Sequence, residues 1–165
     1  AMEGLLRRQV DCAAITTPCP VRKSLQETAL VSFREILICG SDFHDLTAET
    51  RSLRDLENLP FVCMSRGTST YTFYQQLFLK YNLAFHVEME ARTMDQVLAM
   101  VQSNLGVGFY PESMAASALA AGTVFQIHLA EPIPERFVNL IEDTSRPQSV
   151  AMKAFKKMLL APEEE

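Results

Sequence analysis

The fold is decided by the stretch Thr93–Ser113, whose sequence is TMDQVLAMVQSNLGVGFYPES. Its first half predicts an amphipathic helix, because Val97, Met100 and Val101 fall on one helical face with Leu98 beside them. Polar side chains occupy most of the remaining positions of that half. The second half predicts a glycine-bearing turn, a short buried strand and the start of another helix.

Three residues carry the expectation for the second half. Gly106 can adopt a positive φ where the helix ends, and Gly108 allows the backbone to lie close to a neighbour or a ligand. Pro111 suits the first turn of a helix, where its missing N–H leaves no hydrogen bond unmade. The stretch contains no catalytic residues, which favours a binding function over chemistry.

This stretch resembles the helix and the Gly-x-Gly-Ile-x-x-Pro segment of the effector-binding domain of LysR-type transcriptional regulators. Two further segments occur in the order that this family shows. Residues 5–15, LLRRQVDCAAI, are similar to its Leu-Leu and Asp-x-Ala-Ile segment, with Arg8 where the family usually carries glycine. Residues 53–60, LRDLENLP, resemble its Leu-x-x-Leu and proline spacing, whereas Asp45 replaces the proline of its His-Pro-Leu motif.

The resemblance covers nearly all of the 165 residues. It implies an α/β fold with two Rossmann-like lobes of the type II periplasmic-binding-protein kind, joined by two crossover strands. Lobe II would comprise residues 40–126, and lobe I residues 1–38 and 127–165. We expect lobe I to be partial, because the family's first strand, helix and second strand and its winged helix-turn-helix domain have no counterpart here.

The hydrophobic pattern itself alternates between expected strands and helices, which predicts an α/β architecture with mostly parallel sheets. We expect strands at 10–16, within 27–39, and at 61–64, 84–90, 123–129 and 135–141. Besides the helix of the opening stretch, we expect helices at 2–9, 71–81, 111–121 and 148–160, the last of them amphipathic.

The length and composition predict one globular unit. Hydrophobic residues make up 48% of the chain, which is enough for a core. The formal net charge of −5 argues against direct contact with DNA, since nucleic-acid-binding surfaces are usually basic. No apolar run approaches the roughly 20 residues of a membrane-spanning helix, so no membrane partner is expected. The N-terminus lacks the order of a secretory signal, which favours a cytoplasmic location.

Neither a metal nor a cofactor is expected. The four cysteines form no Cys-x-x-Cys pair, and the three histidines are scattered. Cys12, Cys39 and Cys63 lie in apolar runs, which predicts buried free thiols. A peroxide-sensing branch of the family has cysteines in the segment that is here Ser65–Gln76, which contains none. No hydrolase elbow or dinucleotide fingerprint occurs, so no catalytic residues are expected.

Three segments are candidates for ligand contact, because ligands of open α/β sheets bind beyond the carboxyl ends of strands and at helix N-termini. One segment follows the first strand, one links a strand to a helix, and one closes the strand of the opening stretch. In the family, the matching loop-helix junction and the end of the first-lobe strand supply effector contacts, which points to Ser69, Thr70 and Thr17 by position. The effector-binding candidates are Thr16, Thr17, Pro18, Ser65, Arg66, Gly67, Thr68, Ser69, Thr70, Phe109 and Tyr110.

Each candidate also has a purely structural explanation. The hydroxyls of residues 65–70 can cap the helix that follows them. Arg66 can be a solvated surface charge, and Tyr110 can be a core residue. Outside these segments, Glu35 is expected to be a surface charge on a crossover strand.

The favoured interpretation is the ligand-sensing domain of a LysR-type regulator that binds a small polar or carboxylate effector in the cleft between its lobes. The resemblance implies self-association through contacts between lobe I and lobe II, and DNA contact only through a DNA-binding domain outside these residues. A solute-binding protein of a transport system, with the same fold, is the alternative. A small α/β enzyme would need a nucleophile–base pair or a cofactor loop, and we find neither.

Overall fold

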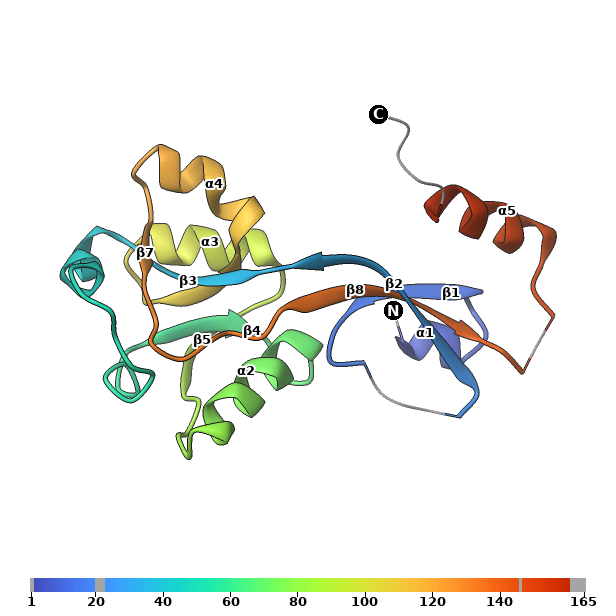
Figure 1. Cartoon of the computed structure of the whole chain (residues 1–165), viewed down its shortest axis with the longest axis horizontal. Helices are drawn as coiled ribbons and strands as arrows, with labels where there is room; N and C mark the ends of the chain where they lie inside the picture. Colours follow the sequence, from blue (N-terminus) through green and yellow to red (C-terminus); the bar gives the residue numbers. More distant parts are fainter. Residues whose placement is uncertain (1, 20–22, 146, 161–165) are drawn as a thin grey trace. The chain divides into compact units, whose positions relative to one another are not determined.

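The computed structural model describes residues 2–19, 23–145 and 147–160, which form two compact units. Unit 1 contains the residues up to Ser32 and those from Phe137 onward, and unit 2 is Phe33–Arg136. Strands β2 (Leu25–Phe33) and β8 (Arg136–Asp143) carry the chain from one unit to the other (Figure 1).

Unit 2 is a sheet covered by helices on both faces (Figure 1). On β3, Leu37 and Cys39 pack in the cluster that contains α2, whereas Ile36 and Ile38 pack in the cluster that contains α3 and α4. Burial on both faces explains why residues 36–39, 61–64 and 107–111 are continuous apolar runs, whereas residues 87–91 alternate between apolar and acidic side chains. Its elements are β3 (Glu35–Cys39), η1 (Ser41–Thr47), β4 (Phe61–Met64), α2 (Ser69–Lys80), β5 (Val87–Ala91), α3 (Met94–Gln102), β6 (Gly108–Pro111), α4 (Glu112–Ala120) and β7 (Phe125–Ile127).

The expectation of mostly parallel sheets is wrong. β4 and β5 are parallel, but β3 lies between β6 and β7 and runs antiparallel to both. Helix α4 connects β6 to β7 so that these two strands run in the same direction. Strand β3 lies between them and runs in the opposite direction. The two ladders are joined where the Val62 N–H donates to Val107 O at 2.8 Å and the Val107 N–H donates to Pro60 O at 2.9 Å.

The stretch 93–113 forms the expected helix, turn, strand and helix. Helix α3 follows Thr93, whose hydroxyl accepts a hydrogen bond from the Gln96 N–H at 3.4 Å, and it buries Val97 and Val101 against the sheet. Pro111 does not lie in the first turn of α4. It is the last residue of β6 and the N-cap of that helix, so its fixed φ serves the junction between strand and helix.

The two glycines of this stretch are both required by close approach. A Cβ on Gly108 would lie 3.1 Å from Val62 O, which confirms the expected proximity to a neighbouring strand. Gly106 has the expected positive φ, 159°, and Asn104 just after α3 is left-handed as well, with a φ of 59°. At Gly106 a Cβ would lie 2.2 Å from Pro60 O, so the carbonyl of the neighbouring segment leaves no room for a side chain.

Unit 1 has a small core. Its elements besides β2 and β8 are α1 (Met2–Leu6), β1 (Cys12–Thr16) and α5 (Val150–Leu159). β1 pairs with β8 in antiparallel register, and α1 packs on this ladder through Leu5, Ala13 and Ile141. The predicted C-terminal helix is present, and an ion pair between Lys156 and Glu142 fastens it to β8.

The bounds of the units differ from those of the lobes that the resemblance implies. Residues 33–38 and 127–136 fall in lobe I by resemblance but in unit 2 in the structure. The reason is backbone pairing: β3 is bonded to β6 and β7, and the Arg51 N–H donates to His128 O at 2.8 Å. The assignment of lobes stays a prediction.

The thiols follow the prediction only in part. Cys39 and Cys63 are buried, whereas Cys12 is half-buried at the start of β1. Burial raises the pKa of Cys39 to about 11 and that of Cys63 to about 12. No helix within the described residues is long and apolar enough to cross a membrane.

Candidate functional site

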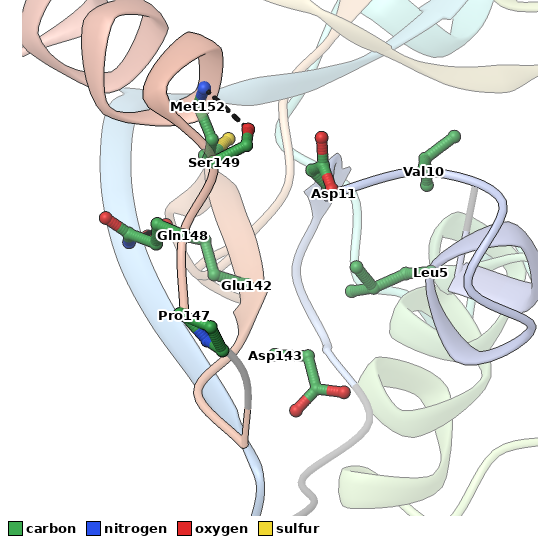
Figure 2. Close-up of a pocket in the computed structure, with 9 residues that line it drawn as sticks. All are labelled: Leu5, Val10, Asp11, Glu142, Asp143, Pro147, Gln148, Ser149 and Met152. Carbon is green, nitrogen blue, oxygen red and sulfur yellow. Dashed lines mark hydrogen bonds between the residues drawn. The ribbon is translucent and has the colours of Figure 1, made fainter.

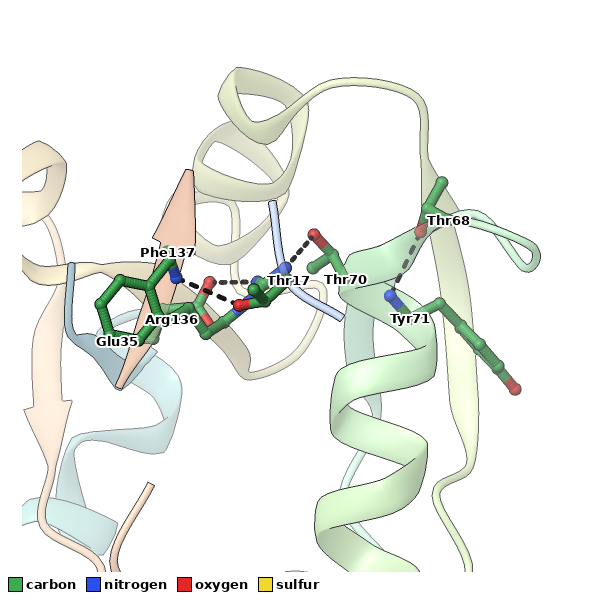
Figure 3. Close-up of polar contacts among 7 residues, drawn as sticks. All are labelled: Thr17, Glu35, Thr68, Thr70, Tyr71, Arg136 and Phe137. Atoms are coloured by element: carbon green, nitrogen blue, oxygen red, sulfur yellow. Dashed lines mark hydrogen bonds and ion pairs between the residues drawn. The ribbon is translucent and has the colours of Figure 1, made fainter. Parts of the chain in front are cut away.

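The candidate site lies at the N-terminus of α2, which begins at Ser69, two residues earlier than the sequence predicts. Thr68 is the N-cap: its Oγ1 accepts a hydrogen bond from the Tyr71 N–H at 3.2 Å and donates to Ser65 O at 2.8 Å (Figure 3). The Thr68 hydroxyl therefore both donates one hydrogen bond and accepts another. Its predicted role as a helix cap is confirmed.

The loop before the helix is held by its own contacts. The Ser65 hydroxyl donates to Ala91 O at 3.1 Å. The exposed Arg66 guanidinium forms an ion pair with Glu90 at 3.4 Å, and its backbone N–H donates to the same carboxylate at 3.2 Å. Gly67 has a φ of 85° and no atom within 4 Å of its would-be Cβ. Ser65 and Arg66 thus have structural roles, and the charge of Arg66 is paired at the surface.

Thr70 is bonded differently. Its Oγ1 accepts a hydrogen bond from Nη2 of Arg136 at 3.2 Å (Figure 3). Among the described residues, none accepts a hydrogen bond from the Thr70 hydroxyl or from its backbone N–H. The start of a helix carries partial positive charge. Half-buried Thr70 therefore presents two donors at a position that favours an anion.

Behind Thr70 lies a buried ion pair. Nη1 of Arg136 donates to Oε1 of Glu35 at 3.0 Å, and each side chain is 1% exposed. The guanidinium carbon lies 4.8 Å from the ring centre of Phe73 and 5.4 Å from that of Phe33. Glu35 is thus not the surface charge that the sequence predicts, because the guanidinium supplies the partner that a buried carboxylate requires.

Two buried polar atoms border this ion pair. Oε2 of Glu35 and the hydroxyl of Tyr74 are both buried, and the carboxylate and the hydroxyl interact with each other. Burial raises the pKa of Glu35 despite the opposing effect of Arg136, and burial followed by Glu35 raises the pKa of Tyr74 well above its usual value.

The remaining candidates belong to the core of unit 2 or to unit 1. Phe109 and Tyr110 are 3% and 1% exposed, and the Phe109 ring stacks on Tyr74 at 4.3 Å, so both are core residues. In unit 1, Thr17 continues the pairing of β1 with β8: its N–H donates to Phe137 O at 2.9 Å, and its Oγ1 accepts from the Phe137 N–H at 3.1 Å (Figure 3). Thr16 and Pro18, on either side of Thr17, are half-buried.

Sequence reasoning missed Arg136, Phe73 and Tyr74 and misassigned Glu35. One signal was available for Glu35, because a charged residue next to the fully buried run ILIC has little access to solvent. For Arg136 no signal existed, since its partner Glu35 lies 101 residues away in sequence.

Two concavities lie away from residues 65–71, one in unit 1 and one beside β3 in unit 2, and both are less suited to an anion. Figure 2 shows the pocket of unit 1, where Asp11 and Asp143 are among the lining residues and Glu142 accepts hydrogen bonds from Gln148 and Lys156. The groove beside β3 in unit 2 is lined by several carboxylates, namely Glu35, Glu112, Glu131 and Glu135. Within the described residues, no group of three or more His, Cys, Asp or Glu side chains could hold a metal ion.

The N-terminus of α2, with the Arg136 guanidinium bonded to Thr70, is suited to an anion. The family model for the LysR substrate binding domain matches residues 1–162. The chain therefore belongs to the LysR substrate-binding-domain family, as its motifs predict.

The probable RuBisCO transcriptional regulator of Guillardia theta is 25% identical over 157 residues, covering 92% of this chain and 51% of the relative. The chain thus spans about half the length of the curated relatives it matches. The Synechocystis PCC6803 CcmR regulatory domain in complex with 2-PG matches with a TM-score of 0.82 and 16% identity, over 96% of this chain and 76% of that one.

The effector-binding domain of QuiR in complex with shikimate matches with a TM-score of 0.78 and 20% identity, over 96% of this chain and 74% of that one. These likenesses confirm the α/β fold of the type II periplasmic-binding-protein kind. The chain is a ligand-binding domain of the kind found in transcriptional regulators, which is favoured over the transport alternative.

Proposed function

We propose that this chain is the effector-sensing part of a longer LysR-type regulator and that it takes a small anionic or polar effector at the N-terminus of α2. The observation that carries the proposal is the hydrogen bond from Arg136 to Thr70. It places a buried cation directly behind a residue that has two donors available within the described structure.

The expected gain in binding energy is substantial. A carboxylate or phosphate at this position could accept hydrogen bonds from the Thr70 O–H and N–H. Each hydrogen bond to a charged group contributes roughly 1.5–3 kcal/mol, and the helix dipole adds roughly 0.3–1 kcal/mol. Two such bonds and the dipole together give roughly 3–7 kcal/mol, which corresponds to dissociation constants from the millimolar range down to about 10 μM, without any contribution from Arg66, whose charge is paired with Glu90.

The other activities of such a regulator belong to the whole protein. We propose that DNA is contacted through a separate domain, because this chain carries a net charge of −5. We also propose that copies of the protein associate, that the chain has no catalytic turnover, and that it works in the cytoplasm, where a regulator meets DNA. Effector binding would act by favouring one conformation of the domain over another.

The test is calorimetry on the 165-residue chain with shikimate and with inorganic phosphate as probes. Replacing Ser69 and Thr70 together by alanine should weaken binding about tenfold or more. Thr72→Ala is the matched control, because the Thr72 hydroxyl lies on the same helix but donates to Thr68 O at 3.1 Å. Equal affinities of the wild-type chain and the Ser69→Ala/Thr70→Ala variant would contradict this placement of the site.

A further inference from the structure

Strand β1 is an edge of the sheet in unit 1. The order of the strands in that sheet is β1–β8–β2, so β1 has a neighbouring strand on one side only within the described residues. Its antiparallel pairing with β8 continues to Thr17, whose N–H donates to Phe137 O at 2.9 Å. In an antiparallel ladder the backbone groups of successive residues point alternately towards and away from the partner strand. The N–H and C=O groups of Cys12 and Ala14 therefore point away from β8.

The outward side of β1 is open at Ala14. Its side chain is exposed, and its N–H and C=O form no hydrogen bond with any described residue. Proteins usually protect such an edge with a charged side chain, a proline or a bulge. Strand β1 has the sequence CAAIT and a regular register with β8, so it has none of these features. The other edge strand, β2, carries the exposed carboxylate of Glu27.

We propose that β1 is an interaction surface that pairs with β1 of a second copy of this chain. The two strands would run antiparallel about a two-fold axis at Ala14 and would join the sheets of unit 1 in both copies into one continuous sheet. This inference deepens the proposed association of copies and rests on it. It does not depend on where the effector binds.

The sequence of β1 is compatible with this self-pairing. The outward N–H and C=O of Ala14 would meet the same groups of the second Ala14, so the two residues would exchange two hydrogen bonds. The same register places Asp11 opposite Thr17 of the second copy, so that like charges do not face each other directly. The small side chain of Ala14 leaves the approach of the second strand open.

The first experiment measures the mass of the 165-residue chain by sedimentation equilibrium over a wide range of concentrations. Ala14→Pro removes the outward N–H but none of the hydrogen bonds to β8, and proline is tolerated in edge strands at such positions. We expect a reversible wild-type dimer. Ala14→Pro should raise its dissociation constant about tenfold or more, because both symmetric hydrogen bonds are lost. Ala14→Ser keeps the N–H and is the matched control, which should associate as the wild type does.

The second experiment tests the register by cross-linking. In a Cys12→Ser/Cys19→Ser background, which lacks the half-buried thiols, Ala14→Cys places two thiols opposite each other. The Cα atoms of a hydrogen-bonded pair lie about 5.5 Å apart, a separation that a disulfide spans. With diamide as oxidant, the two thiols should form an intermolecular disulfide while diamide is reduced to its hydrazine. Val31→Cys in the same background is the control, because Val31 is 56% exposed on the other edge strand and should give no cross-link.

Each result decides a separate question. A dimer that Ala14→Pro leaves unchanged, or an Ala14→Cys protein that does not cross-link, would overturn the inference while the proposed association stands. Loss of the dimer in Met158→Lys but not in Ala14→Pro would assign the contact to α5, where Met158 is 78% exposed. A chain that stays monomeric at all concentrations would overturn both proposals. If Ala14→Pro does not fold, the cross-link alone decides.

Discussion

Replacing Arg136 by methionine should destabilise unit 2 strongly, because it leaves the Glu35 carboxylate without its partner at 1% exposure. Removing one member of a buried ion pair typically costs about 3–5 kcal/mol. A domain of this size has a free energy of unfolding of about 5–15 kcal/mol, so this single change would remove a large fraction of it. In the Glu35→Leu/Arg136→Met variant no charge remains buried, and the free energy of unfolding should stay close to that of the wild type.

The loss of unfolding free energy in the Arg136→Met variant should also depend on pH, and the protonation of Glu35 determines whether the loss grows or shrinks as the pH rises. Burial already raises the pKa of Glu35 above its ordinary value of 4.5, and removing the opposing effect of Arg136 raises it further. An acid whose pKa is raised in the folded state favours folding when protonated, so its penalty accumulates as the pH rises from 4.5 through the folded-state pKa. The Arg136→Met variant should therefore recover part of its loss between pH 7 and pH 5.

The assay is urea unfolding at several pH values, followed by circular dichroism, for the wild type and the single and double variants. The reasoning predicts a large loss for the single variant at pH 7, a smaller one at pH 5, and a nearly pH-independent difference between wild type and the double variant. A loss below about 1 kcal/mol at pH 7, or a loss that does not change with pH, would refute it.

Further tests address other parts of the chain. Gly40→Ala should lower the free energy of unfolding by about 1–3 kcal/mol, because a Cβ would lie 2.5 Å from a backbone carbonyl of α3. The loss would appear as a lower urea midpoint, and an unchanged midpoint would argue against that packing. In the folded protein, thiol reagents should modify half-buried Cys12 and Cys19 before Cys39 and Cys63, which mass spectrometry can resolve. A gel-shift assay should show no sequence-selective DNA binding by these 165 residues at physiological salt. Nanomolar binding would contradict the proposal that a separate domain contacts DNA.

Local signals were sufficient for most of the fold. Helical spacing identified α3, and the apolar runs identified β3 and β4, because residues buried on both faces need no alternation. Motif order then indicated the family, which the match over residues 1–162 confirms. Strand direction was not predictable in this way, since β3 meets β6 and β7 through pairing over long sequence separation.

The candidate site was predicted only in part. The hydroxyl-rich loop before α2 is a local feature, and its position at a helix start follows from the sequence. Which hydroxyl is available does not follow, because Thr68 is engaged as the cap and Thr70 is bonded to Arg136. Burial of Glu35 likewise depends on a partner supplied from β8, and no local pattern reports such a contact.

The most direct test of the central claim is a nuclear magnetic resonance titration of the isotope-labelled chain with shikimate. An effector that binds at the N-terminus of α2 should shift the backbone amide signals of Ser69, Thr70 and Tyr71 in a saturable manner, and Thr70→Val should weaken that response about tenfold. Saturable shifts confined to other parts of the chain, such as the pocket of unit 1 around Glu142, with no change at these three amides, would contradict the account.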